Sequence, residues 1–256
     1  MRTSYNTNVE FTPSTIVKTT LRTYKPAFAQ KLINDTEKYY SDLAQEPVDV
    51  PELLDINTLP AENGTVAVQT ISALDNNPNL QTISGADRMP ALELTLAKIA
   101  DMRTYEGSKL HTPMDAIGPN FHVNIDDESL VLVDTFPPIP RDARGRIPYE
   151  NIQFTNVPGR RAYIDFYRGT RPGVMMHTLA SVAFGYSPAR QVAATVQHSH
   201  QELHDVIPQN LPVAESTFLH NEIDRNFKSY VRYWTVSDAL CFAALQAENL
   251  RSKLSR

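Results

Sequence analysis

The longest regular pattern of apolar positions in this sequence runs from Ser216 to Leu254. Large apolar residues recur there mostly at steps of three and four, which places them on one face of an α-helix. They are Leu219, Ile223, Phe227, Tyr230, Trp234, Cys241 and Leu245, followed less regularly by Leu250 and Leu254. The opposite face carries Asp224, Arg225, Lys228, Arg232, Glu248 and Arg251. The pattern predicts one long helix, or two with a break at Thr235–Ser237, where Thr235 or Ser237 caps the second. Its aromatic face must pack either on the rest of the chain or on a second copy.

Two earlier stretches also have helical spacing and are bounded by helix-starting and helix-ending residues. Pro26 suits the first turn of a helix that continues to about Gln45, because proline lacks the N–H that the first turn leaves unpaired anyway. Pro47 then ends it. Pro90 opens a second helix in the same way, and Gly107 is placed to stop it.

Alternating apolar and polar residues predict strands, mainly in the centre of the chain. The predicted strands are Thr65–Ile71, Leu80–Ile83, Phe121–Ile125, Leu130–Val133, Ile152–Val157 and Ala162–Tyr167. Residues 47–62 and 136–148 contain three and four prolines, respectively, and are predicted to be loops. These elements indicate an α+β fold with a central antiparallel sheet over about residues 120–167, flanked by N-terminal helices and the long C-terminal helical segment.

The remaining segments complete the expected organisation. Residues 1–24 are rich in Thr, Asn and Ser and are interpreted as an extended N-terminal arm or an edge strand, followed by a single domain over 25–256. Residues 174–183 fit a buried strand or a helix equally well. Ser187 and Pro188 form a helix start, and that helix is expected to reach about Ile207.

Composition and charge exclude several classes of protein. A hydrophobic content of 41% and a charged content of 21% are typical of a globular protein. The net charge of −5 gives no overall attraction to nucleic acid or acidic membranes. The single cysteine, Cys241, excludes an intrachain disulfide and a cysteine-based zinc cage.

Compartment is inferred from what the sequence lacks. No run approaches the roughly 18 apolar residues of a membrane span, and the polar N-terminus lacks the apolar core of a signal peptide. We therefore expect a cytoplasmic protein with no membrane partner and no cofactor. Its content of Asn, Thr and Pro, with little lysine and glycine, resembles that of phage-encoded proteins, which suggests the cytoplasm of an infected host or a virus particle.

Arginines and aromatic residues are concentrated between residues 136 and 172. This segment has a local charge of +4, so the rest of the chain carries −9. Guanidinium groups bind phosphates and aromatic faces stack on bases, so the mixture suits single-stranded RNA. The same arginines suit bidentate pairing with carboxylates, either elsewhere in the fold or on an acidic protein partner. The candidate binding residues are Arg141, Arg144, Arg146, Arg160, Arg161, Tyr163, Tyr167, Arg168 and Arg171.

A histidine-rich segment, residues 198–205, is a weak metal-site candidate. His200 and His204 are four residues apart and lie on one flank of a helix, so they could share a metal ion. His198 and Glu202 each lie 200° from His200 around the helix and cannot join them. Two histidines make at most half of a zinc site, so we expect no metal, and capping or solvated histidines are the simpler interpretation.

The fragment Phe166-Tyr167-Arg168-Gly169-Thr170 resembles the first-strand arginine motif of ADP-ribosyltransferases. In that family the arginine holds the dinucleotide phosphates, so the resemblance implies a strand around Arg168 and a transferase activity. The family also needs a Ser-Thr-Ser strand and a Glu-x-Glu or Gln-x-Glu pair. Ser181 and Ser187 do not form the triplet, and Gln201-Glu202 lacks the intervening residue.

These observations favour a protein whose role is to make contacts. The first hypothesis is a non-enzymatic structural or assembly protein, most naturally a homo-oligomer or a partner of other protein subunits. In this hypothesis the C-terminal helix and the N-terminal arm make subunit contacts, and the arginine loop meets an acidic surface. A single-stranded RNA-binding protein is the alternative, and an ADP-ribosyltransferase-like enzyme is the second alternative.

Overall fold

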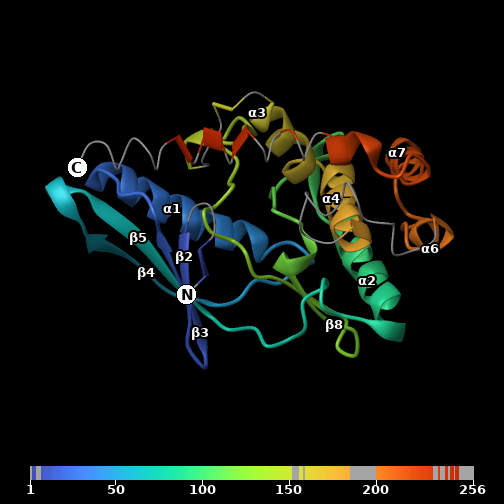
Figure 1. Cartoon of the computed structure of the whole chain (residues 1–256), viewed down its shortest axis with the longest axis horizontal. Helices are drawn as coiled ribbons and strands as arrows, with labels where there is room; N and C mark the ends of the chain where they lie inside the picture. The colour runs from blue at the N-terminus through green and yellow to red at the C-terminus, as the bar shows by residue number, and fades with distance from the viewer. Residues whose placement is uncertain are drawn as a thin grey trace.

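The computed structural model describes residues 2–3, 7–151, 156–157, 159–184 and 200–232, together with positions 236, 240–241, 243–244 and 246–247. Figure 1 shows an α+β protein in which a sheet packed on one helix lies beside a group of helices. The predicted fold class is therefore confirmed. No helix in this described part is both long enough and apolar enough to cross a membrane.

The main sheet is antiparallel and is built from the N-terminal part of the chain. Its strands follow the order β1 (Arg2–Thr3), β2 (Thr7–Phe11), β3 (Thr15–Thr20), β5 (Val66–Ala73) and β4 (Leu53–Pro60). The prediction that placed the sheet at about residues 120–167 is wrong. The expected extended conformation of residues 1–24 is seen in β2 and β3, which pair with each other, and β3 also pairs with β5.

Helix α1 (Pro26–Leu43) covers one face of this sheet, as Figure 1 shows. Alternate residues of β3 and β5 are buried, because neighbouring strand residues point to opposite faces. Val68 meets Ala29 and Leu32 of α1 in a small core that Phe136 completes. On β4, by contrast, most side chains are exposed or half-buried, so this strand forms an open edge.

The larger core surrounds helix α4 (Arg171–Phe184), the segment whose sequence fitted either a strand or a helix. Every residue from Pro172 to Phe184 is buried, as expected for a helix that is apolar on all sides. Helix α2 (Arg88–Ala100) and the hairpin of β8 (Phe121–Asn124) and β9 (Ser129–Leu132) contribute to the same core. The predicted helices at Pro26 and Pro90 and the predicted hairpin are confirmed, but the second helix ends at Ala100 rather than near Gly107, because Thr104–Glu106 forms a strand.

The predicted strand at Ala162–Tyr167 is wrong. The chain forms helix α3 (Arg160–Tyr163) and then a π-helix, η5 (Ile164–Arg168). Tyr163, Ile164 and Tyr167 are the buried residues there, at steps of three and four that place them on one helical face, whereas a strand would point the adjacent Tyr163 and Ile164 to opposite faces. The other strand predicted in this region, Ile152–Val157, lies largely outside the described residues.

Two further predictions failed between residues 47 and 83. The predicted proline-rich loop at 47–62 contains strand β4, and the predicted strand Leu80–Ile83 is a turn. The small elements are η1 (Glu62–Gly64), η2 (Gly85–Asp87), β6 (Thr104–Glu106), β7 (Lys109–Leu110), η3 (Gly118–Asn120) and η4 (Tyr149–Asn151). The loop predicted at 136–148 is confirmed.

The C-terminal segment is helical but breaks earlier than expected. After α6 (His200–Asp205), helix α7 (Val213–Asp224) ends in a turn at residues 225–227, where Asn226 and Phe227 have φ of 51° and 52°. Helical conformation resumes over 228–232. The expected break at Thr235–Ser237 lies largely outside the described residues.

The apolar stripe of this segment faces the chain's own core over its described part. Leu219, Ile223, Phe227 and Tyr230 are all buried, and the rings of Phe227 and Phe184 meet edge to face with centroids 5.5 Å apart. These four side chains are therefore not available for contact with a second copy. Trp234, Leu245, Leu250 and Leu254 lie outside the described residues.

Candidate functional site

A charged groove runs between α1 and the loop of residues 140–150. It consists of two adjoining cavities of about 350 Å³ and about 820 Å³, which share Lys38, Arg141, Asp142 and Ala143 as lining residues. We call it the α1 groove. Its basic lining residues are Lys31, Lys38, Arg103, Arg141, Arg146 and Arg161. Its acidic lining residues are Asp35, Asp42, Asp142 and Glu150. The lining therefore has a formal excess of two positive charges in a chain of net charge −5.

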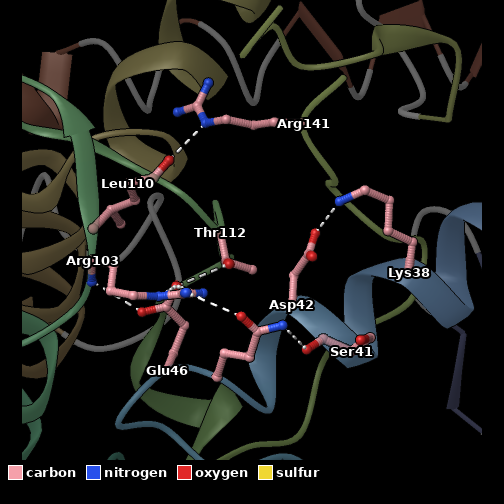
Figure 2. Close-up of polar contacts among 9 residues, drawn as sticks. Lys38, Ser41, Asp42, Glu46, Arg103, Leu110, Thr112 and Arg141 are labelled. Carbon is pink, nitrogen blue, oxygen red and sulfur yellow. Dashed lines mark hydrogen bonds and ion pairs between the residues drawn. The ribbon is translucent and has the colours of Figure 1, made fainter. Parts of the chain in front are cut away.

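Helix α1 forms one wall of the groove. Two ion pairs lie along this wall, and the two partners of each pair are four residues apart in sequence. Lys31 and Asp35 lie 2.6 Å apart, and Lys38 pairs with Asp42 in the same way. Side chains at this spacing share one helix face, so the pairs form a row along α1. Lys31 also reaches across the groove to Glu150, at 3.2 Å. The Lys38–Asp42 pair faces the interior of the smaller cavity in Figure 2.

Glu46, whose side chain is fully buried, holds two residues that line the smaller cavity, Arg103 and Thr112. Arg103 donates to Glu46 from its backbone N at 3.0 Å, from Nε at 3.3 Å and from Nη2 at 3.2 Å. Thr112 adds a fourth donor at 3.2 Å (Figure 2). A buried carboxylate is tolerated when it is paired and hydrogen-bonded in this way. The network holds the end of α1 against residues 103–112.

Arg141 provides a fixed positive charge where the two cavities meet. Its guanidinium donates to the carbonyl oxygens of Leu110, Gly145 and Gly169 at 2.7, 2.8 and 2.7 Å (Figure 2 shows the first). Burial lowers the pKa of Arg141 from its usual value. Within the described part of the chain it forms no salt bridge, so its charge is oriented by neutral oxygens and by the ring of Tyr105, whose centroid lies 5.2 Å from Arg141 Cζ.

The loop after Arg141 is shaped by Asp142, which accepts hydrogen bonds from the backbone N of Arg144 and Arg146, at 2.8 and 2.9 Å, and from Arg146 Nε at 3.0 Å. The hydrogen bond from the Arg146 backbone is the largest cause that lowers the pKa of Asp142. The side chain of Arg146 remains 68% exposed. The loop therefore presents basic side chains to solvent from a defined backbone.

Two neighbouring arginines stack on tyrosines. Arg161 lies over the ring of Tyr149, with its Cζ 5.0 Å from the ring centroid, and Arg160 lies over Tyr163 at 5.1 Å. Arg161 and Tyr149 both line the larger cavity. Burial, followed by a hydrogen bond with Asp165, raises the pKa of Tyr149 above its usual range.

The other predicted binding residues lie away from the groove. Arg171 pairs with Glu215 at 2.8 Å, and the Arg168 side chain, only 13% exposed, pairs with Asp115 at 2.6 Å. Tyr163 and Tyr167 are 1% and 7% exposed. The structure thus brings Arg141, Arg146 and Arg161 into the groove. Arg144 is exposed on the same loop but lines neither cavity, and neither cavity is lined by Arg160, Tyr163, Tyr167, Arg168 or Arg171.

The structure contradicts what the ADP-ribosyltransferase resemblance implies for Arg168. That motif requires an arginine on a strand with its guanidinium free for phosphates. Arg168 instead lies on the π-helix η5 and is engaged by Asp115.

The two histidines considered as metal ligands, His200 and His204, contact different residues rather than a common site. His200 Nε2 lies 2.8 Å from Asn226 Oδ1, whereas His204 Nε2 lies 2.9 Å from Asp224 Oδ1 and its Nδ1 lies 2.6 Å from His220 Nδ1. Asp224 and His220 therefore occupy opposite nitrogens of the His204 ring and cannot both join it around one ion. Among the described residues, no group of three or more His, Cys, Asp or Glu side chains is arranged to hold a metal.

Sequence reasoning missed Lys31, Lys38 and Arg103. The Lys-Asp spacing of four residues in α1 was a visible signal for paired charges. Their position opposite the arginine loop was not visible, because it depends on how α1 and the loop pack. A scan against protein-family models found no match, and a search of the curated proteins found no significantly similar sequence.

Proposed function

We propose that this chain is a non-enzymatic structural or assembly protein, and that the α1 groove binds an acidic segment of a protein partner. The observation that carries the proposal is that several basic residues of the groove are held in ion pairs whose carboxylates a partner can replace. These ion pairs are partly exposed, with Lys31, Lys38 and Arg146 side chains 44%, 54% and 68% exposed. Exposed ion pairs contribute about 0–1 kcal/mol each, so a partner's carboxylates can replace the internal ones at little cost.

Arg141 gives the groove a positive charge that is not held in an ion pair, so no internal carboxylate has to be displaced before a partner binds. Its position is held by three carbonyl oxygens, which accept hydrogen bonds from three of its five N–H donors without neutralising its charge. A cation fixed in advance loses little conformational freedom on binding. An acidic segment would therefore meet a prearranged charge at the junction of the two cavities.

A protein partner fits this lining better than single-stranded RNA does. RNA recognition needs exposed aromatic faces, yet Tyr163 and Tyr167 are buried and the ring of Tyr149 is stacked under Arg161. Tyr105, the exposed ring in the lining, is already in contact with the cations of Lys109 and Arg141. Four carboxylates also line the groove and would repel a continuous run of phosphates.

The single cysteine and the phage-like composition support a role in the cytoplasm, of an infected host for example, or in a virus particle.

The proposal is tested by reversing charge in the groove and measuring the mass of the protein in solution by light scattering. Arg146→Glu with Arg161→Glu should abolish a salt-sensitive oligomer. Lys228→Glu with Arg232→Glu makes the same charge change at exposed positions outside the groove and should leave the oligomer intact. Addition of a short single-stranded RNA distinguishes the alternative, because an increase in mass with RNA only at low salt would replace the protein-contact proposal with RNA binding.

A further inference from the structure

We infer that the acidic segment received by the α1 groove is the tip of the β8–β9 hairpin of a second copy of this chain. The inference rests on the proposed function and names the partner of the same groove. The tip carries three consecutive acidic residues, Asp126, Asp127 and Glu128, and all three are exposed. Within the described part of the chain, none of them forms a salt bridge.

The tip has a defined shape. Asn124 Oδ1 accepts hydrogen bonds from the backbone N of Asp126 at 3.1 Å and of Asp127 at 3.3 Å, and Asn124 Nδ2 donates to Asp127 Oδ2 at 2.7 Å. Glu128 closes the turn with a φ of 51° and a hydrogen bond from its N to Ile125 O at 3.2 Å. The carboxylates of Asp126 and Glu128 are thus held on a rigid backbone. A preformed segment gives up little entropy when it binds.

Charge and shape are complementary between the tip and the groove. The tip is convex and adds three negative charges, whereas the groove is concave and has an excess of two positive charges. The two surfaces do not meet within one molecule, because the turn that joins β8 to β9 points away from α1, at the lower right of Figure 1. The contact is therefore between copies. It joins two different surfaces, so it forms either reciprocally in a two-fold dimer or head-to-tail in a ring or an open filament.

The test is a charge swap between two variants. The tip variant is Asp126→Lys with Glu128→Lys, which keeps Asp127 and its bond to Asn124. The groove variant is Arg146→Glu with Arg161→Glu. Each variant alone should associate at least tenfold more weakly than the unmodified chain in sedimentation velocity at low salt. An equimolar mixture should recover association, because each variant then meets a surface of opposite charge.

Each outcome has one meaning. Recovery in the mixture supports the contact and also shows that both variants are folded. Loss in both variants without recovery overturns the inference, as does a tip variant that associates like the unmodified chain. In this last case a loss confined to the groove variant leaves the proposed function intact with a different acidic partner. If the groove variant is also unaffected, the proposed function fails as well. An unmodified chain that stays monomeric overturns the inference.

Discussion

The ion pair between Arg168 and Asp115 makes a quantitative prediction about stability. The two side chains are 13% and 19% exposed, and their contact is 2.6 Å long. Removing one partner of a buried pair leaves the other charge without compensation and costs about 3–5 kcal/mol. The partial exposure of Asp115 lets water reach the remaining carboxylate, so we take the lower end. Arg168→Ala is expected to lower the free energy of unfolding by about 3 kcal/mol.

Urea denaturation followed by circular dichroism measures this change. With an m-value of about 3 kcal/mol/M, the midpoint should fall by about 1 M. Arg144→Ala is the matched control, because Arg144 is exposed and should change stability by no more than about 0.5 kcal/mol. A double variant, Arg168→Met with Asp115→Leu, removes both charges together. It should cost at least about 1 kcal/mol less than the sum of the two single changes, because neither charge is then stranded.

Two results would refute the reasoning. One is an Arg168→Ala protein as stable as the Arg144→Ala control. The other is a double variant whose cost equals the sum of the single costs, which would mean that the two side chains act independently. A loss of labelled ADP-ribose incorporation on Arg168→Ala at unchanged stability would instead restore a catalytic interpretation of Arg168.

Three other predictions concern the stability of the folded chain. Burial holds the pKa of His177 well below its usual value of 6.5, so the imidazole of the unfolded chain binds a proton more readily than that of the folded chain. The free energy of unfolding should therefore fall as the pH drops below about 6.5, with a limiting slope of about 1.4 kcal/mol per pH unit. His177→Gln should flatten the slope in denaturant titrations between pH 4 and 7. Gly173→Ala should cost about 3 kcal/mol, because its Cβ would lie 2.0 Å from Phe166 O, whereas Gly107→Ala, strained only by a φ of 57°, should cost about 1 kcal/mol in the same assay. Arg103→Ala removes two of the donors to buried Glu46 and should cost about 2 kcal/mol; a melting temperature unchanged within error would contradict this.

The sequence predicted elements well where periodicity and boundary residues agree. Helix α1 has apolar spacing between Pro26 and Pro47, and the β8–β9 hairpin has alternation on both sides of Asp126–Asp127. Strand β4 was missed because the three prolines of residues 47–62 indicated a loop, and the adjacent apolar residues Leu53 and Leu54 gave no alternation to oppose it. The structure explains this with an irregular register between Leu53 and Asp55.

The candidate site was only partly predictable for a similar reason. Local charge density identified Arg141, Arg146 and Arg161, which all line the groove. It also selected Arg168 and Arg171, because a sequence does not show that Asp115 and Glu215, 53 and 44 residues away, engage them. Tertiary pairing decides which arginines remain at the surface.

The main sheet is formed by the N-terminal part of the sequence, and this position affects how the chain folds during translation. The described strands of the main sheet and α1 all lie within residues 2–73, so they can pair while the remainder is still being translated. The larger core cannot close in the same way, because α4 is covered by residues as late as Phe227 and Tyr230. We therefore expect the nascent chain to form its N-terminal sheet and α1 first and to hold α4 uncovered until α7 emerges. A ribosome-bound chain that ends near residue 210 should thus be a chaperone substrate, whereas the full-length chain should not.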